Sequence, residues 1–237
     1  MIFGAILAGG VGTRMNISQM PKQFLPLGDK PIVIHTIEKF LMCSRFDKIY
    51  VGVNPEWKLY MKDLIDQYNL DKDLIIIVDG GTDRNGTIIN ILESIKYDFG
   101  DRDDHVIITH DSVRPFVTLR IIEDNITSVL RTGACDTVVA ATDTIVTSED
   151  GKVISSIPNR TNMYQGQTPQ SFKVNLLYDL YNDLKEEERE TLTDACKICV
   201  FRGYPVEMIK GEVSNIKITT VSDYKIAIAM VGGKGLD

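Results

Sequence analysis

A glycine turn followed by two cations is the stretch of this sequence best suited to chemistry. Gly9 and Gly10 end the apolar run Ile2 to Ala8, and Arg14 and Lys22 come next. Glycines let the backbone turn sharply and bring its N–H groups close to a ligand. Fixed positive charges beside such a turn suit the oxygens of a polyphosphate. The stretch therefore predicts a loop that binds a polyphosphate.

The two common phosphate fingerprints do not match this turn. No Gly-x-x-x-x-Gly-Lys-Ser/Thr run occurs in the chain, and Gly10-Val11-Gly12 lacks the third glycine of a dinucleotide loop. The second expected strand ends in Val53-Asn54, without the acidic residue that a dinucleotide site needs. For the glycines alone, a plain strand-to-loop turn is the alternative. Arg14 and Pro21-Lys22-Gln23 favour a ligand loop.

A carboxylate is expected at the same edge of the fold. Asp111 comes directly after His110, at the end of the apolar run Val106 to Thr109. Mg²⁺ prefers one or two carboxylates together with phosphate oxygens and water. Asp111 is therefore predicted as a ligand of Mg²⁺ or another divalent cation.

Alternating strands and helices must position these groups. Strands are expected at 2–8, 48–53, 74–78, 106–109, 137–141, 206–210 and 216–219, with a strand and turn at 163–170. Helices are expected at 31–43, 55–68, 83–97, 119–132, 174–188, 193–202 and 222–231, the last capped by Ser222. The alternation predicts an α/β fold with one doubly wound, mostly parallel sheet in a single domain, 1–237. Ligands of such sheets bind beyond the carboxyl ends of the strands, where Gly9, Gly80 and Asp111 all fall.

The pattern breaks after Ala141. Segments 143–148 and 153–157 flank the turn Glu149-Asp150-Gly151, which is a hairpin signal. We therefore expect a protruding β-arm at about 142–162. Because such an arm cannot bury both of its faces alone, we expect it to pack against another subunit of a homodimer.

The bulk composition excludes several classes of protein. A formal net charge of −7 argues against binding a nucleic-acid polymer, which needs a basic face. No apolar run approaches the ~20 residues of a membrane span, and no basic leader follows Met1. We expect a cytoplasmic protein without membrane association.

The four cysteines include one pair with the spacing of a metal or redox site. Cys196 and Cys199 are separated by two residues, but the chain has only three histidines and no second such pair. Both lie in an expected helix, where positions i and i+3 share a face. Buried thiols are the favoured interpretation, and a metal or redox role is the alternative.

Several motifs together resemble one enzyme family. They are Ala8-Gly-Gly-Val-Gly-Thr-Arg-Met15, Pro21-Lys22-Gln23, Gly80-Gly81-Thr-Asp-Arg-Asn-Gly-Thr87, His110-Asp-Ser-Val-Arg-Pro115, Thr168-Pro169-Gln170, Thr193-Asp194 and Asn215-Ile-Lys217. In these residues the chain resembles the IspD/TarI cytidylyltransferase family over nearly its whole length. The resemblance implies a Rossmann-like, GT-A-like nucleotidyltransferase fold. It also implies CTP and a polyol phosphate as substrates, Mg²⁺ as the cofactor, and pyrophosphate as a product.

The resemblance also implies roles for individual residues. Catalytic roles fall to Arg14, Lys22 and Lys217. Contacts to the nucleotide and its metal fall to Leu7, Ala8, Gly9, Gly10, Gly12, Gly80, Gly81, Asp83, Arg84, Thr87 and Asp111. Contacts to the acceptor fall to Thr144, Arg160, Thr168 and Thr193, with Thr144 and Arg160 reaching the site of the neighbouring subunit.

Three positions stay open within this resemblance. Ser214 stands where the methylerythritol branch has an aspartate near the metal, so the second carboxylate ligand is in doubt. Arg114 binds either phosphate or a structural carboxylate. His110 has the type of a catalytic base, but we expect it to pack in the interior.

The segments 110–116, 164–172 and 192–197 resemble the ribitol branch of the family, which implies ribitol 5-phosphate as the acceptor. Methylerythritol 4-phosphate is the nearest competing acceptor. Two competing functions are a hexose-1-phosphate nucleotidyltransferase on the same fold and a catalytically silent nucleotide-binding module.

Overall fold

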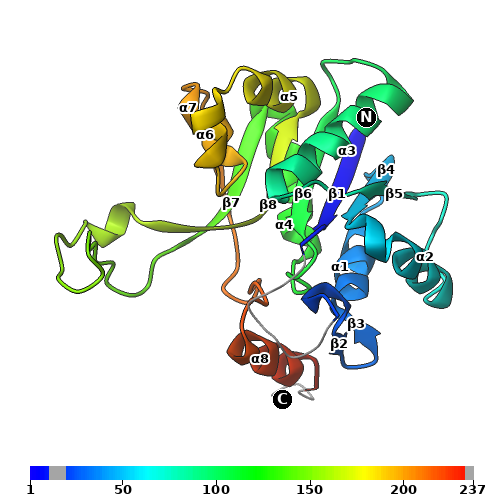
Figure 1. Ribbon diagram of the computed structural model, residues 1–237, viewed down its shortest axis with the longest axis horizontal. Helices are drawn as coiled ribbons and strands as arrows, with labels where there is room; N and C mark the ends of the chain where they lie inside the picture. The colour runs from blue at the N-terminus through cyan, green and yellow to red at the C-terminus, as the bar shows by residue number, and fades with distance from the viewer. Residues whose placement is uncertain (11–19, 233–237) are drawn as a thin grey trace.

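The computed structural model describes residues 1–10 and 20–232, which form a seven-stranded sheet with helices on both faces (Figure 1). The strands of this sheet are β1 (Ile2–Ala8), β4 (Lys48–Val53), β5 (Ile75–Asp79), β6 (Val106–Asp111), β7 (Ala134–Ala140), β8 (Tyr164–Lys173) and β9 (Glu207–Lys210). A separate pair consists of β2 (Pro26–Leu27) and β3 (Lys30–Pro31).

Eight α-helices and three short 3₁₀ helices connect the strands in the described residues. The α-helices are α1 (Ile32–Leu41), α2 (Lys58–Gln67), α3 (Arg84–Phe99), α4 (Leu119–Thr132), α5 (Val174–Asn182), α6 (Glu186–Glu190), α7 (Cys196–Phe201) and α8 (Val221–Gly232). The 3₁₀ helices are η1 (Lys22–Phe24), η2 (Pro55–Trp57) and η3 (Arg160–Asn162).

The strand order is β5-β4-β1-β6-β8-β7-β9. β1 pairs in parallel with β4 on one side and with β6 on the other, so that Leu7 lies opposite both Gly52 and Asp111. The chain thus leaves β1 in one direction through β4 and β5 and returns on its other side with β6. This reversal makes a crevice beyond the carboxyl ends of β1 and β6.

Two apolar layers cover the sheet, one on each face. In β1, Ile6 and Ala8 pack with α1, α2 and α4, whereas Phe3 and Leu7 pack with α3, α5 and α7. Successive side chains of a strand point to opposite faces, so a strand buried on both sides is apolar throughout. The predicted doubly wound α/β fold is confirmed.

The sheet departs from the expected pattern at β8. This strand runs antiparallel to both of its neighbours, β6 and β7. The strand expected within residues 163–170 is present, but the turn expected there is absent, because β8 runs from Tyr164 to Lys173. Its length brings Thr168 and Gln170 into the interior of the sheet.

The arm spans residues 141–163 and extends away from the body of the molecule (Figure 1). The two strands expected there were wrong: a single antiparallel bridge joins Thr147 and Ser156. A two-stranded ribbon needs packing against a further apolar surface to hold a longer ladder. Within this chain Val153 and Ile157 are more than half exposed and supply no such packing.

Three other expectations were wrong. Residues 216–219 are not a strand, since Ile218 donates one hydrogen bond to the Val113 carbonyl and forms no ladder. The helix expected at 174–188 divides into α5 and α6. Ser222 lies inside α8, and Thr220 and Asp223 make the reciprocal bonds that cap it, at 2.7 and 3.2 Å.

Across the described residues, every helix is too short or too polar to cross a lipid bilayer.

Candidate active site

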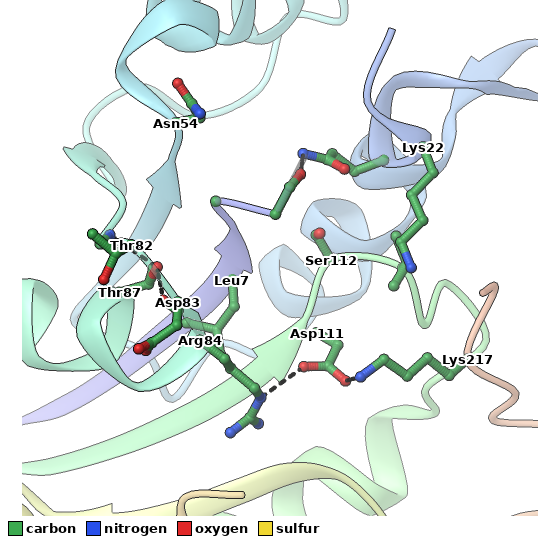
Figure 2. A pocket seen from close by; sticks show the side chains of 15 residues that line it. Leu7, Lys22, Asn54, Thr82, Asp83, Arg84, Thr87, Asp111, Ser112 and Lys217 are labelled. Carbon is green, nitrogen blue, oxygen red and sulfur yellow. Dashed lines mark hydrogen bonds and ion pairs between the residues drawn. The ribbon is translucent and has the colours of Figure 1, made fainter. Parts of the chain in front are cut away.

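A pocket of about 420 Å³ opens beyond the carboxyl ends of β1, β4 and β6 (Figure 2). It is lined by Leu7, Gly9, Gly10, Lys22, Gln23, Asn54, Gly81, Thr82, Asp83, Arg84, Thr87, Asp111, Ser112, Val113 and Lys217. The two glycine segments, both lysines predicted to be catalytic and the predicted metal ligand thus face one cavity.

Gln23 fixes the start of the first glycine turn. Its buried amide donates one hydrogen to the Ala8 carbonyl and the other to the Gly10 carbonyl, both at 2.8 Å. Because both donors are used, the amide holds the end of β1 against η1. This contact sets Lys22, the preceding residue, at the wall of the pocket. Gly12 and Arg14 lie outside the described residues, and their roles stay predictions.

The second glycine segment touches the first. A Cβ on Gly80 would lie 3.1 Å from the Gly9 Cα, and a Cβ on Gly81 would lie 2.4 Å from the Gly86 carbonyl carbon. A side chain at Gly81 is therefore excluded by backbone, and the two loops share one wall of the pocket.

The N-terminus of α3 is organised by two side chains. Asp83 caps the helix by accepting from the Gly86 N–H at 2.7 Å. The Thr87 hydroxyl accepts from the Gly81 N–H at 3.0 Å and donates to the Asp83 carbonyl at 2.9 Å. Thr87 thus ties the glycine loop to the helix, and its predicted contact to a nucleotide stays a prediction.

Asp111 is the electrostatic centre of the pocket. Its Oδ1 lies 3.1 Å from Nε of Arg84, and its Oδ2 lies 2.8 Å from Nζ of Lys217 (Figure 2). Nε of Arg114 lies 3.6 Å from the same Oδ2. Burial raises the pKa of Asp111, but Arg84, Lys217 and Arg114 together outweigh it and hold the pKa well below its usual range. Asp111 is therefore a carboxylate at neutral pH.

His110 is linked to the backbone of Asp111 through the hydroxyl of Thr168. The Asp111 N–H donates to the Thr168 hydroxyl at 3.2 Å, and that hydroxyl lies 2.9 Å from Nδ1 of His110. The other ring nitrogen, Nε2, lies 3.0 Å from the Arg114 carbonyl, which only accepts. Nε2 therefore carries the proton and Nδ1 accepts from Thr168. Burial lowers the pKa of His110 to about 4, so the ring is neutral and packs in the interior, as predicted.

Arg114 was left open between phosphate and a structural carboxylate. In the structure Arg114 pairs with a carboxylate of the protein: it is buried, faces Asp111 and donates to the Asn215 carbonyl at 2.7 Å. This contact ties the segment that carries Lys217 to the end of β6.

The remaining predicted residues lie outside the pocket wall. Ala8 and Gly80 do not line it, although their neighbours Leu7, Gly9 and Gly81 do. Thr168 is buried and contacts both His110 and Asp111. Thr193 is exposed on the segment before α7. Thr144 and Arg160 lie in the arm, where Arg160 donates to the Thr142 carbonyl at 2.9 Å.

Five residues that line the pocket had no individual role assigned from the sequence: Gln23, Asn54, Thr82, Ser112 and Val113. All except Asn54 lie within the motifs that carry the family resemblance. Asn54 follows the end of β4 and Ser112 follows the end of β6. The rule that ligands bind at the carboxyl ends of parallel strands would have identified both.

All four cysteines are buried and form no disulfide. Burial raises the pKa of Cys199 to about 12, so that the thiol is protonated and unreactive at neutral pH. The interpretation as buried thiols agrees with this arrangement.

The family model described as "2-C-methyl-D-erythritol 4-phosphate cytidylyltransferase" (IspD) matches residues 2–233. The chain belongs to this family. It is also 55% identical over 232 residues to the ribitol-5-phosphate cytidylyltransferases of Streptococcus pneumoniae serotype 2 (strain D39) and serotype 4 (strain TIGR4), covering 98% of this chain and 99% of each relative.

Solved structures of the IspD family share the fold. The 4-diphosphocytidyl-2C-methyl-D-erythritol synthase of Anaerococcus prevotii superposes with a TM-score of 0.81 at 26% identity, covering 98% of this chain and 96% of that one. The Francisella tularensis enzyme gives 0.78 at 24% identity, covering 95% and 97%. The predicted nucleotidyltransferase fold and enzyme class are confirmed.

Proposed function

We propose that this chain transfers CMP from CTP to D-ribitol 5-phosphate, forming CDP-ribitol and pyrophosphate. The observation that carries the proposal is the carboxylate of Asp111, set among cations at the sheet edge where two glycine segments meet. The near full-length identity to ribitol-5-phosphate cytidylyltransferases supports the choice of acceptor.

The chemistry needs no general base in the protein. A phosphate monoester has a second pKa of about 6 and is mostly a dianion at neutral pH. Its oxygen attacks the α-phosphorus of CTP, the bond to the β,γ-pyrophosphate breaks, and pyrophosphate leaves. His110 agrees with this scheme, because it is buried and both of its ring nitrogens are engaged.

The obstacle is repulsion between anions and the negative charge that builds on the phosphorus oxygens. Lys22 and Lys217 both line the pocket, although they are far apart in the sequence (Figure 2). We assign them, with Arg14, to the stabilisation of that charge. Lys217 has 40% of its side chain exposed, so it has room to turn from Asp111 toward a phosphate.

Mg²⁺ is usually bound by one or two carboxylates together with phosphate oxygens and water, and Asp111 offers one carboxylate beside the proposed phosphate site. When bound, the ion would neutralise charge on the triphosphate. Asp111 would hold it together with phosphate oxygens and water, once Lys217 leaves Oδ2. A second carboxylate from the segment of Ser214 does not fit, because Glu212 is engaged by Arg120 at 2.9 Å and Thr118 at 3.1 Å.

We also propose a cytoplasmic homodimer in which the arm reaches the partner's pocket. The exposed Val153, Ile154 and Ile157 of the arm support an apolar contact with a second copy. Thr144 and Arg160 would then contribute to acceptor binding in the neighbouring subunit.

The test is pyrophosphate release with CTP, Mg²⁺ and each of two acceptors under the same conditions. We expect a higher kcat/KM for ribitol 5-phosphate than for methylerythritol 4-phosphate, since a site built to bond a hydroxyl rejects an analogue lacking it by up to ~10⁴-fold. A preference for methylerythritol 4-phosphate would overturn the acceptor and leave the cytidylyl transfer. Pyrophosphate release only with a hexose 1-phosphate, or no pyrophosphate release with any acceptor, would overturn the proposed function.

A further inference from the structure

We propose that Gln170 is a positioning residue whose amide holds the guanidinium of Arg84 against Asp111, with Asp136 and Asp194 fixing the orientation of that amide. The inference rests on the proposed function in one respect only, namely that Asp111 serves the reaction.

Gln170 lies in β8 with no exposed surface. Its Nε2 donates to Oδ2 of Asp194 at 2.7 Å and to Oδ1 of Asp136 at 3.1 Å. Its Oε1 accepts from Nη2 of Arg84 at 2.9 Å. Each donor of the amide nitrogen and one acceptor site of the oxygen are therefore used.

The surroundings permit only one orientation of this amide. A rotation by half a turn would place the NH₂ group against the guanidinium of Arg84, which has only donors. It would also place the amide oxygen against the carboxylate of Asp194. The carboxylates of Asp136 and Asp194 thus decide which end of the amide faces the pocket.

Arg84 transmits this orientation to Asp111. The guanidinium is a planar fork, so fixing two of its nitrogens fixes the whole group. Nη2 is held by Gln170, and Nε lies 3.1 Å from Oδ1 of Asp111. One carboxylate oxygen of Asp111 is thereby held, and the other faces Lys217 in the pocket.

The same acidic pair has a competing interpretation as a cation site. Ligand atoms of Asp136, Asp194 and Cys196 lie within 4.8 Å of one another. However, N–H groups already point at these oxygens: Gln170 donates to both carboxylates, and the Cys196 N–H donates to Oδ1 of Asp194 at 2.8 Å. Burial, followed by the charge of Asp194, raises the pKa of Asp136 to about 7. The pair therefore acts as a hydrogen-bonded anchor for the amide of Gln170.

Gln170→Met is the decisive variant, because it keeps the length of the side chain and removes its donors and acceptor. Asn125→Leu is the matched control. Asn125 is equally buried, accepts from the hydroxyl of Ser171 in β8 and donates to the hydroxyl of Thr137 in β7. Ser171 follows Gln170 in β8, so its side chain points to the opposite face of the strand.

The first readout is the Nε–H resonance of Arg84 in a ¹H–¹⁵N spectrum, assigned by its loss in Arg84→Lys. We expect slow exchange with water in the wild type and in Asn125→Leu, and fast exchange in Gln170→Met. This readout needs no substrate, so it decides the inference even if the proposed function fails.

The second readout is kcat/KM for CTP and ribitol 5-phosphate. Loss of a partner that orients a site ligand typically costs about 10–100-fold, and we expect this for Gln170→Met. In an Arg84→Lys background the same substitution should cost less than about 3-fold, because the residue it orients has already been altered.

Two results would overturn the inference. One is an unchanged Arg84 resonance in folded Gln170→Met. The other is an equal fold-loss from Gln170→Met in the wild-type and Arg84→Lys backgrounds, which would show that Gln170 acts independently of Arg84. If Gln170→Met does not fold, fast exchange of the Arg84 Nε–H in the wild-type protein would overturn it instead.

Discussion

Nζ of Lys217 lies 2.8 Å from Oδ2 of Asp111, joining the segment after β9 to the carboxyl end of β6. Lys217 occupies the carboxylate oxygen that a divalent cation would need. If Asp111 binds a divalent cation, as we propose, that ion and Lys217 would meet at the same oxygen, and the lysine would then be able to turn toward phosphate. This ion pair couples Asp111, the proposed metal ligand, to a residue that we assign to catalysis.

Lys22→Ala should lower kcat by about 10²–10³, with a smaller effect on the affinity for CTP, because its charge matters most as negative charge develops at phosphorus. The same is expected of Arg14→Ala. Steady-state kinetics and calorimetric titration with CTP separate the two effects.

Lys30→Ala is the control for Lys22, because Lys30 pairs with Glu38 and does not line the pocket. Turnover by Lys22→Ala at the level of Lys30→Ala would remove Lys22 from the mechanism.

Asp111→Asn should abolish turnover and also lower stability. Three cations would lose their carboxylate, and removing one partner of a buried ion pair costs about 3–5 kcal/mol. Chemical denaturation measures the free energy of unfolding, and pyrophosphate release with Mg²⁺ or EDTA measures the metal requirement.

Asp124→Asn is the matched control for the stability effect. Asp124 pairs with Arg120 on the surface of α4, where such pairs contribute at most about 0.5 kcal/mol. Full activity in EDTA would exclude the metal from the mechanism, and an equal loss of stability in the two variants would contradict the central position of Asp111.

Asp136 gives a prediction about pH. Its pKa rises from 3.8 to about 7 on folding, through burial and the charge of Asp194. Between these values the folded protein holds a proton that the unfolded chain has released, so this group makes stability fall as the pH rises from about 4 to 7. In Asp136→Asn this dependence should be absent, because asparagine does not titrate.

We therefore expect the melting temperature of Asp136→Asn, relative to the wild type, to be higher at about pH 8 than at about pH 5. Thermal unfolding of both proteins at the two pH values checks this. A difference that does not change with pH would show that Asp136 titrates normally in the fold.

The sequence predicted best what depends on local patterns. β1, β4 and α4 have the expected bounds, because each is an unbroken apolar or amphipathic segment with clear end signals. The glycine segments and Asp111 were placed at one edge because parallel strands must end together there.

The parts that failed depend on contacts between distant segments. Nothing near residue 217 in the sequence shows that Lys217 pairs with Asp111, or that Ile218 bonds Val113 and prevents a strand. The sequence also carried no sign that Thr168 is buried, where its hydroxyl accepts from the Asp111 N–H, and its predicted contact to the acceptor stays a prediction. Gln170 carries no local signal of its three partners.

The arm provides the last prediction. Arg160 lies in the arm, which extends away from the body, and it is absent from the pocket of its own chain (Figure 1). If the arm completes the pocket of a partner, each active site combines Lys22 from one chain with Arg160 from the other. Lys22→Ala and Arg160→Ala should each be inactive alone. In a mixed dimer, one site then carries both lesions and the other carries neither.

An equal mixture of the two variants, after subunit exchange, should recover about a quarter of the wild-type activity, because half of the dimers are mixed and each has one intact site. A mixture of Lys22→Ala with Asp111→Asn is the control. Both lesions lie in the body of the molecule, so every site keeps one of them and no activity should return. Subunit exchange is verified by mass spectrometry of differently tagged chains. Absence of recovery despite exchange would mean that each site is built within one chain, and the exposed Val153 and Ile157 of the arm would then need another partner.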